Sequence, residues 1–200
     1  MTAASTKNIL FIQTGGTIDK EYPKTIGGYN FEIGDPAIDR AVARVKPTVG
    51  FSYRSKSICQ KDSQDIDQTD RDSLAKCIAE ATETRIVVTH GTDTIIDTGK
   101  FLQKELRKFQ ANGRKNIILV GSFIPERFKD SDADINIGAA LGALDAFDIS
   151  AYDDHTKCNK STVVYISLGG RVIPAEKAVR NSITGLFCHC DEMNVPGEYK

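Results

Sequence analysis

The sequence predicts a single α/β domain with a doubly wound, mainly parallel sheet, and two observations support this prediction. Short apolar segments rich in Ile and Val recur along the chain, and segments with helical spacing of apolar residues separate them. Strands are continuously apolar when helices cover both faces of their sheet. The length of 200 residues suits one domain with a substantial core. We place this domain at 8–200, after a flexible polar tail at 1–7.

Apolar content and alternation define the predicted strands, which are 8–13, 51–58, 85–89, 116–121 and 162–168. Residues 51–58 alternate polar and apolar side chains, which is typical of a strand near the edge of a sheet. Residues 18–33 contain Gly27-Gly28 and other turn formers, so we expect a flap or hairpin there. Residues 148–160 are polar and irregular, and we expect them to form a surface loop.

Start and stop signals predict the first two helices. Asp35 and Pro36 have the order of a capping residue and a first-turn proline, and Pro47 ends that helix. Thr69 or Asp70 begins the second helix. Its predicted buried side chains are Leu74, Ile78 and Ala81.

Apolar periodicity predicts two further helices. The third runs from about Asp93 to Gln110 and ends at Asn112-Gly113. The fourth runs from about Ala133 to Phe147. The side chains expected on their buried faces are Leu102, Leu106 and Phe109 in the third helix, and Ile137, Leu141 and Leu144 in the fourth.

Composition excludes several classes of function. The formal net charge is −1, so we expect neither nucleic-acid nor membrane binding. No apolar segment approaches the roughly 18 residues of a membrane span. The N-terminal residues lack the basic start and apolar stretch of a signal peptide. The five cysteines are odd in number and irregularly spaced, which favours a reduced, cytoplasmic protein.

Residues 188–191, with the sequence Cys-His-Cys-Asp, are a candidate half of a metal site. A structural zinc ion takes four ligands, which usually come in paired clusters. His155 and Cys158 are the residues that could complete such a site, but they form no second cluster nearby in the sequence. We therefore expect half-buried thiols at Cys188 and Cys190, and neither a metal nor another cofactor.

Small polar residues follow every predicted strand. Ligands of open parallel sheets bind beyond the carboxyl ends of the strands, so these turns predict a site for a compact polar molecule. The glycine-rich turns match neither the dinucleotide-binding nor the Walker pattern. The turns are Gly15-Gly16-Thr17, Asp62-Ser63-Gln64-Asp65, His90-Gly91-Thr92-Asp93, Gly121-Ser122 and Gly169-Gly170-Arg171.

Each of these residues also has a purely structural interpretation. Thr17 can cap a turn, and Thr92 or Asp93 can cap the third helix. Ser63 and Gln64 can be turn formers, and a single histidine at a strand end, such as His90, is more often structural than catalytic. The combined pattern is more specific than its parts.

Taken together, the motifs resemble the L-asparaginase family of the bacterial kind, which includes glutaminase-asparaginases. The resemblance covers roughly residues 8 to 180. It rests on Thr14-Gly15-Gly16-Thr17-Ile18, Ser63-Gln64-Asp65, His90-Gly91-Thr92-Asp93-Thr94, Val120-Gly121-Ser122-Phe123-Ile124-Pro125 and Ser131-Asp132-Ala133-Asp134-Ile135-Asn136. It implies the N-terminal α/β domain of that family and an amide hydrolase that needs no cofactor.

The resemblance also implies roles for individual residues. Thr17 is the nucleophile, and Tyr29 on the flap activates it, with Tyr22 as the second candidate. Thr92 and Asp93 form a second triad with a lysine. Ser63, Gln64 and Asp93 bind the charged groups of the substrate, and the remaining residues expected in the substrate site are Gly16, Gly91 and Ser122.

Three departures from the family pattern qualify these roles. Arg180 occupies the position of the family's lysine, so Lys177 is the residue predicted to take that role. The resemblance ends near the C-terminus of this sequence, so we expect a short form that lacks the family's smaller C-terminal domain. Asp19 and Glu21 make the flap unusually charged, and we expect both to face solvent.

The resemblance implies that the chain cleaves the side-chain amide of L-asparagine, giving L-aspartate and ammonia, as a homodimer or higher homo-oligomer. Another amide is a possible substrate. The competing hypothesis is a non-catalytic module that binds a small amino acid or related metabolite, because Arg180 stays charged and cannot carry a proton.

Overall fold

The structure is a computed structural model, and it describes residues 8–24, 30–48, 50–108, 114–153 and 162–194. Its centre is a six-stranded sheet in the order β4-β1-β5-β6-β7-β8. The strands from β4 to β7 run parallel, and β8 pairs antiparallel with β7. Their bounds are β1 Asn8–Gly15, β4 Ser52–Lys61, β5 Arg85–Thr89, β6 Asn116–Val120, β7 Val163–Leu168 and β8 Arg171–Pro174. The predicted mainly parallel sheet is confirmed, and β4 is an edge strand as its alternation indicated.

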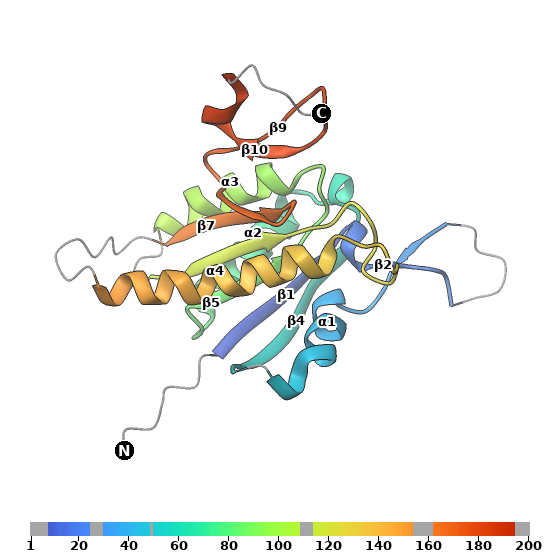
Figure 1. The fold of residues 1–200 in the computed structure, drawn as a ribbon, viewed down its shortest axis with the longest axis horizontal. Coiled ribbons are helices and arrows are strands. Elements are labelled where there is room, and N and C mark those ends of the chain that lie inside the picture. Colours follow the sequence, from blue (N-terminus) through green and yellow to red (C-terminus); the bar gives the residue numbers. More distant parts are fainter. Residues whose placement is uncertain (1–7, 25–29, 49, 109–113, 154–161, 195–200) are drawn as a thin grey trace.

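Helices cover both faces of the sheet, as the doubly wound prediction requires. One face packs against α1 (Ala37–Val45) and α4 (Ala133–Asp153), and the other packs against α2 (Gln68–Glu80) and α3 (Ile95–Leu106). Figure 1 shows α4 crossing one face of the sheet. Side chains of a strand point alternately to the two faces. Along β1, Ile9 and Phe11 therefore enter one apolar cluster, whereas Leu10 and Ile12 enter the other.

The predicted helix starts were close, but their capping residues were wrong. Helix α1 begins after Pro36 without a cap from its own flanking side chain, because the distant Asp19 carboxylate accepts the Ala37 N–H instead. Helix α2 is capped by Asp67, which forms a reciprocal capping box with Asp70. The predicted burial of Leu74, Ile78 and Ala81 is confirmed.

Helix α3 begins at Ile95, and Thr94 precedes it without a side-chain capping bond. The prediction that Thr92 or Asp93 caps this helix is therefore wrong. Helix α4 continues to Asp153, so the predicted loop at 148–160 begins too early. The sequence from 148 to 153 contains neither Gly nor Pro, so nothing local ends the helix there. Phe109, the predicted Asn112-Gly113 stop and residues 154–160 lie outside the described residues.

Two small antiparallel pairs flank the main sheet. Strands β2 (Lys20–Glu21) and β3 (Glu32–Ile33) form the base of the predicted hairpin. Strands β9 (Ala178–Arg180) and β10 (Phe187–His189) lie beyond β8, at the top of Figure 1, and the sequence did not predict them. In the described part of the chain, no helix is long and apolar enough to cross a membrane.

The two apolar clusters predict the effect of mutations in the central strand β6. Ile117 and Ile118 are fully buried on opposite faces. Ile117→Ala and Ile118→Ala are each expected to lower the free energy of unfolding by about 2–5 kcal/mol in urea denaturation, because each leaves a cavity. Ile183, which is 93% exposed, supplies the control, and its replacement by Ala should change stability by less than about 0.5 kcal/mol. A lower free energy of unfolding for only one of the two β6 variants would contradict an apolar core on both faces of the sheet.

Candidate active site

The carboxyl ends of β1, β4 and β5 meet at a point where the order of the strands reverses. The connection after β1 leads to β4 on one side, whereas the connection after the neighbouring strand β5 leads to β6 on the other side. Such a switch point opens a crevice in a parallel sheet. A pocket of about 350 Å³ occupies this place. Its lining residues are Thr17, Lys20, Asp62, Ser63, Gln64, Asp65, Thr92 and Asp93.

Three turns approach one another very closely behind this pocket. Gly16 has a φ of 85°, and a Cβ added to it would lie 2.2 Å from the backbone of Gly91. A Cβ added to Gly91 would lie 2.6 Å from the Cβ of Ser63. Only glycine allows such an approach, since any side chain would displace backbone. The motif glycines therefore act by letting the Thr17, Ser63 and Thr92 turns converge.

The turn that carries Thr17 is held from both sides. Residues 17–19 form a short 3-10 helix after β1, and the Gly16 N–H donates to the carbonyl of Lys61 at 2.9 Å. This bond uses the Gly16 N–H, so that N–H is not a free donor toward the pocket.

Asp19 and Glu21 are buried, so the expectation that both face solvent is wrong. Asp19 accepts the Ala37 N–H at 2.6 Å and the Thr89 hydroxyl at 2.8 Å. It thereby joins the Thr17 turn to helix α1 and to the end of β5. Burial raises the pKa of Asp19 to about 6, although its hydrogen bonds act in the opposite direction. Glu21 pairs with Arg127 at 2.7 Å.

Gln64 and Asp93 meet across the pocket wall. The Gln64 amide donates to the Asp93 carboxylate at 2.8 Å, and the Arg180 guanidinium pairs with the other carboxylate oxygen at 2.9 Å. The hydrogen bond from Gln64, followed by that from Arg180, holds the pKa of Asp93 below its ordinary value. The Asp93 carboxylate is therefore ionised and hydrogen-bonded through both of its oxygens.

Arg180 is the residue that reaches Asp93 from the small β9–β10 sheet. Its guanidinium lies 5.9 Å from the Phe123 ring centre and 5.5 Å from that of Phe187, which fixes its direction. Lys177 lies in the exposed turn between β8 and β9. Within the described residues, its side chain forms neither a hydrogen bond nor an ion pair. The geometry thus brings Arg180, and not Lys177, to the predicted second triad.

Several other predicted residues lie outside the lining of the pocket. Ser122 is fully buried, and its hydroxyl donates to the Ile124 carbonyl at 2.6 Å. His90 is also fully buried, and burial lowers its pKa to about 4, so it is a neutral structural side chain at pH 7. Tyr29 lies outside the described residues. The Tyr22 ring packs against the Phe31 ring at an angle of 48°, with ring centres 5.1 Å apart.

The pocket contains an ion pair that the sequence interpretation missed. Lys20 directly follows the Thr17 turn, and its ammonium lies 2.6 Å from the carboxylate of Asp62, which directly precedes Ser63. The hydrogen bond from Lys20 holds the pKa of Asp62 below its ordinary value. The available signal was a pair of opposite charges beside the motifs, because Asp62 directly precedes Ser63 and Lys20 lies two residues after Ile18.

The Ser131–Asn136 motif has a structural role in this chain. The Asp132 carboxylate accepts the backbone N–H groups of Phe123 and Ile124. Asn136 donates to the Gly121 carbonyl at 2.9 Å and accepts the Gly170 N–H at 2.9 Å. These bonds hold the loops after β6 and β7 to the start of α4.

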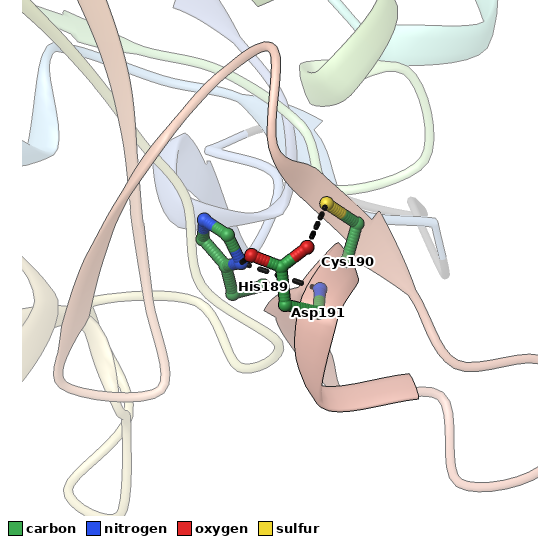
Figure 2. Close-up of side chains that lie close together, drawn as sticks. All are labelled: His189, Cys190 and Asp191. Atoms are coloured by element: carbon green, nitrogen blue, oxygen red, sulfur yellow. Dashed lines mark hydrogen bonds and ion pairs between the residues drawn. The ribbon is translucent and has the colours of Figure 1, made fainter. Parts of the chain in front are cut away.

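The candidate half metal site has three of its potential ligands together. The ligand atoms of His189, Cys190 and Asp191 all lie within 4.8 Å of one another. Figure 2 shows the Asp191 carboxylate between the other two side chains. Its oxygens lie 3.3 Å from His189 Nδ1 and 3.5 Å from Cys190 Sγ. His155 and Cys158 lie outside the described residues. The Asp191 carboxylate contacts both other side chains, and the absence of a metal here stays a prediction.

The fold and pocket define a class of protein, namely a parallel α/β domain with threonine hydroxyls and charged side chains at its switch point. Comparison with known families is consistent with this class. The sequence profile described as "Asparaginase, N-terminal" matches residues 8–185. The chain therefore belongs to the asparaginase family, as the resemblance of its motifs predicted.

Individual relatives agree with this assignment. A probable periplasmic L-asparaginase of Haemophilus influenzae is 27% identical over 187 residues, which cover 92% of this chain and 49% of that protein. An L-asparaginase of Thermococcus kodakarensis is 31% identical over 135 residues, which cover 66% of this chain and 39% of that protein. The chain thus spans about half the length of these relatives or less.

Solved structures show the same fold. The thermostable L-asparaginase from Thermococcus kodakarensis superimposes with a TM-score of 0.68 at 23% identity, covering 91% of this chain and 51% of the other. The probable cytoplasmic L-asparaginase from Campylobacter jejuni superimposes with a TM-score of 0.68 at 24% identity, covering 93% of this chain and 54% of the other.

The raised pKa of Asp19 predicts a pH-dependent stability. The folded state holds the proton more tightly than the unfolded state does, so the free energy of unfolding falls as pH rises from about 3.8 to about 6. Relative to Asp19→Asn, which does not titrate, the wild type should lose up to about 3 kcal/mol across this window. Urea denaturation of both proteins from pH 4 to 7.5 measures the difference. A difference that stays constant with pH would contradict the buried, titrating carboxylate.

Proposed function

We propose that the chain is an amidohydrolase that cleaves the side-chain amide of L-asparagine to L-aspartate and ammonia, with Thr17 as nucleophile. The observation that carries the proposal is the pocket at the switch point. Thr17 and Thr92 line it together with Ser63, Gln64 and Asp93. Family membership supports the same reaction, because the matched relatives are described as L-asparaginases.

The chemistry divides into two displacements at one carbonyl carbon. The Thr17 hydroxyl adds to the amide carbon, and its proton passes through a neighbouring base to the nitrogen, which leaves as ammonia. The product of this step is an ester between Thr17 and the acyl group. Water then adds to the ester carbon, releases the carboxylic acid and returns the proton to Thr17.

Residues around Thr17 have defined tasks in this scheme. The backbone N–H of Thr92 stabilises the negative oxygen that develops on the carbonyl. Ser63 and Gln64 hold the charged end of the substrate, which positions the amide carbon for attack. Tyr29 is the proposed base for the Thr17 proton, as the family resemblance implies, and no metal or cofactor enters the scheme.

A second candidate function has its own structural support. Arg180 pairs with Asp93 and cannot accept a proton at ordinary pH. A site without a proton-carrying lysine suits a module that binds a small amino acid without turnover. Tight binding of L-asparagine in calorimetry, with no ammonia released during long incubation, would favour this function over hydrolysis.

Substrate range, assembly and location remain proposals. Glutamine and other amides belong in the first substrate panel, since a pocket of about 350 Å³ also admits them. We propose a homodimer or higher homo-oligomer, which light scattering can test. We also propose a cytoplasmic location, which the odd number and irregular spacing of the cysteines support.

Removing the nucleophile gives the direct test of hydrolysis. Thr17→Ala should lower kcat by at least about a thousandfold, because no other hydroxyl can replace the attacking group. Thr17→Ser should retain measurable activity, since it keeps the hydroxyl. A coupled ammonia assay measures both variants, with exposed Thr82→Ala as the matched control. Equal rates for wild type and Thr17→Ala would remove Thr17 from the mechanism.

A further inference from the structure

We infer that Lys20 is a specificity-determining residue, whose ammonium binds the carboxylate of an amino-acid amide in the Thr17 pocket. This inference rests on the proposed function for the identity of the ligand. The position of Lys20 itself comes from the structure alone. Its ammonium lies in the wall of the pocket, between the turn that carries Thr17 and the turn that carries Ser63.

Acidic side chains outnumber basic ones in the lining of the pocket. Among the described lining residues, Lys20 is the sole cationic side chain, and it stands against the carboxylates of Asp62, Asp65 and Asp93. A ligand carboxylate entering this pocket meets repulsion from these groups. It therefore needs a cation inside the pocket, because the net charge of the whole protein supplies no attraction.

Arg180 does not provide this cation. It lies outside the lining residues, and its guanidinium is bonded to Asp93 and to the carbonyl of Gly185. Cation–π contacts with the rings of Phe123 and Phe187 hold the Arg180 guanidinium in this position. Arg180 thus offsets the charge of Asp93 and leaves Lys20 as the group available to a ligand.

Lys20 retains the hydrogen-bonding capacity to accept a second anion. Its ammonium has three N–H donors, and its contact with Asp62 uses one of them. The side chain is 26% exposed, so it is partly shielded from water yet open to the pocket. A charge-assisted hydrogen bond at such a site is stronger than one formed in bulk water.

Asp62 prepares Lys20 for this task. The 2.6 Å ion pair holds the ammonium at one place, which reduces the conformational entropy lost on binding. Asp62 also caps the 3-10 turn of Ser63–Asp65, since its carboxylate accepts the Gln64 N–H. The ion pair therefore links the position of the cation to that of Gln64.

L-Aspartate is the probe for this site, because it carries the required carboxylate and is not consumed. In isothermal titration calorimetry of the full chain, Lys20→Met should weaken L-aspartate binding by about tenfold or more. Lys20→Arg keeps the charge and should recover most of the affinity. Lys76→Met, on the exposed surface of α2, is the matched control and should bind as the wild type does.

Asp62→Asn separates a ligand-binding cation from a simple link between two turns. If Lys20 acts only by holding Asp62, both Lys20→Met and Asp62→Asn weaken binding equally, and the inference is overturned. If Lys20 binds the ligand, Lys20→Met weakens binding more than Asp62→Asn does, because Asp62→Asn keeps the ammonium in the pocket and removes only the carboxylate that positions it. Circular dichroism of each variant confirms that the fold is retained.

Turnover distinguishes this inference from the proposed hydrolysis. With L-asparagine, Lys20→Met should raise KM by about tenfold or more and leave kcat within about threefold. If the wild type releases no ammonia but its aspartate binding depends on Lys20, hydrolysis fails and the assignment of Lys20 stands. Unchanged binding in Lys20→Met, or no aspartate binding by the wild type, overturns the assignment.

Discussion

The site depends on the contact between the backbones of Gly16 and Gly91. At this contact the turn after β1 touches the turn after β5, and Gly91 in turn touches Ser63 from the turn after β4. Parallel pairing of β1 with both β4 and β5 brings the ends of these strands to one edge of the sheet. Any larger side chain at these glycines would hold the turns apart, and the three turns could no longer line one pocket.

Buried and paired charges surround this contact. Asp19 is the last residue of the Thr17 turn and connects it to α1 and β5 through two hydrogen bonds. At the pocket wall, Lys20 pairs with Asp62, whereas Asp93 is held by Gln64 and Arg180. The pocket is therefore lined by ion pairs more than by free charges. We infer that a charged ligand must compete with these pairs, so that charge complementarity contributes to selectivity.

Much of the fold could be predicted from the sequence because its strands are buried on both faces. Such strands, as at 85–89, are apolar throughout, and that signal is local. The convergence of Thr17, Ser63 and Thr92 also followed from a general rule of parallel sheets. The family resemblance then assigned their roles.

The remaining features depend on contacts between distant residues. Asp19 caps a helix that begins 18 residues later, and Lys20 meets Asp62 across 42 residues, so no local pattern identifies either contact. The β9 strand that brings Arg180 to Asp93 is three residues long, too short for a reliable periodicity. The extension of α4 to Asp153 shows how a polar sequence without helix breakers resembles a loop.

We propose that the converged turns present the Thr17 hydroxyl to an amide carbon. Rapid acid quenching of the protein during turnover of L-asparagine, followed by peptide mass spectrometry, identifies the residue that attacks. We expect the peptide with residue 17 to gain the mass of one aspartyl group, carried as an ester. An aspartyl group on Thr92 instead, or turnover with no covalent intermediate at any threonine, would contradict it.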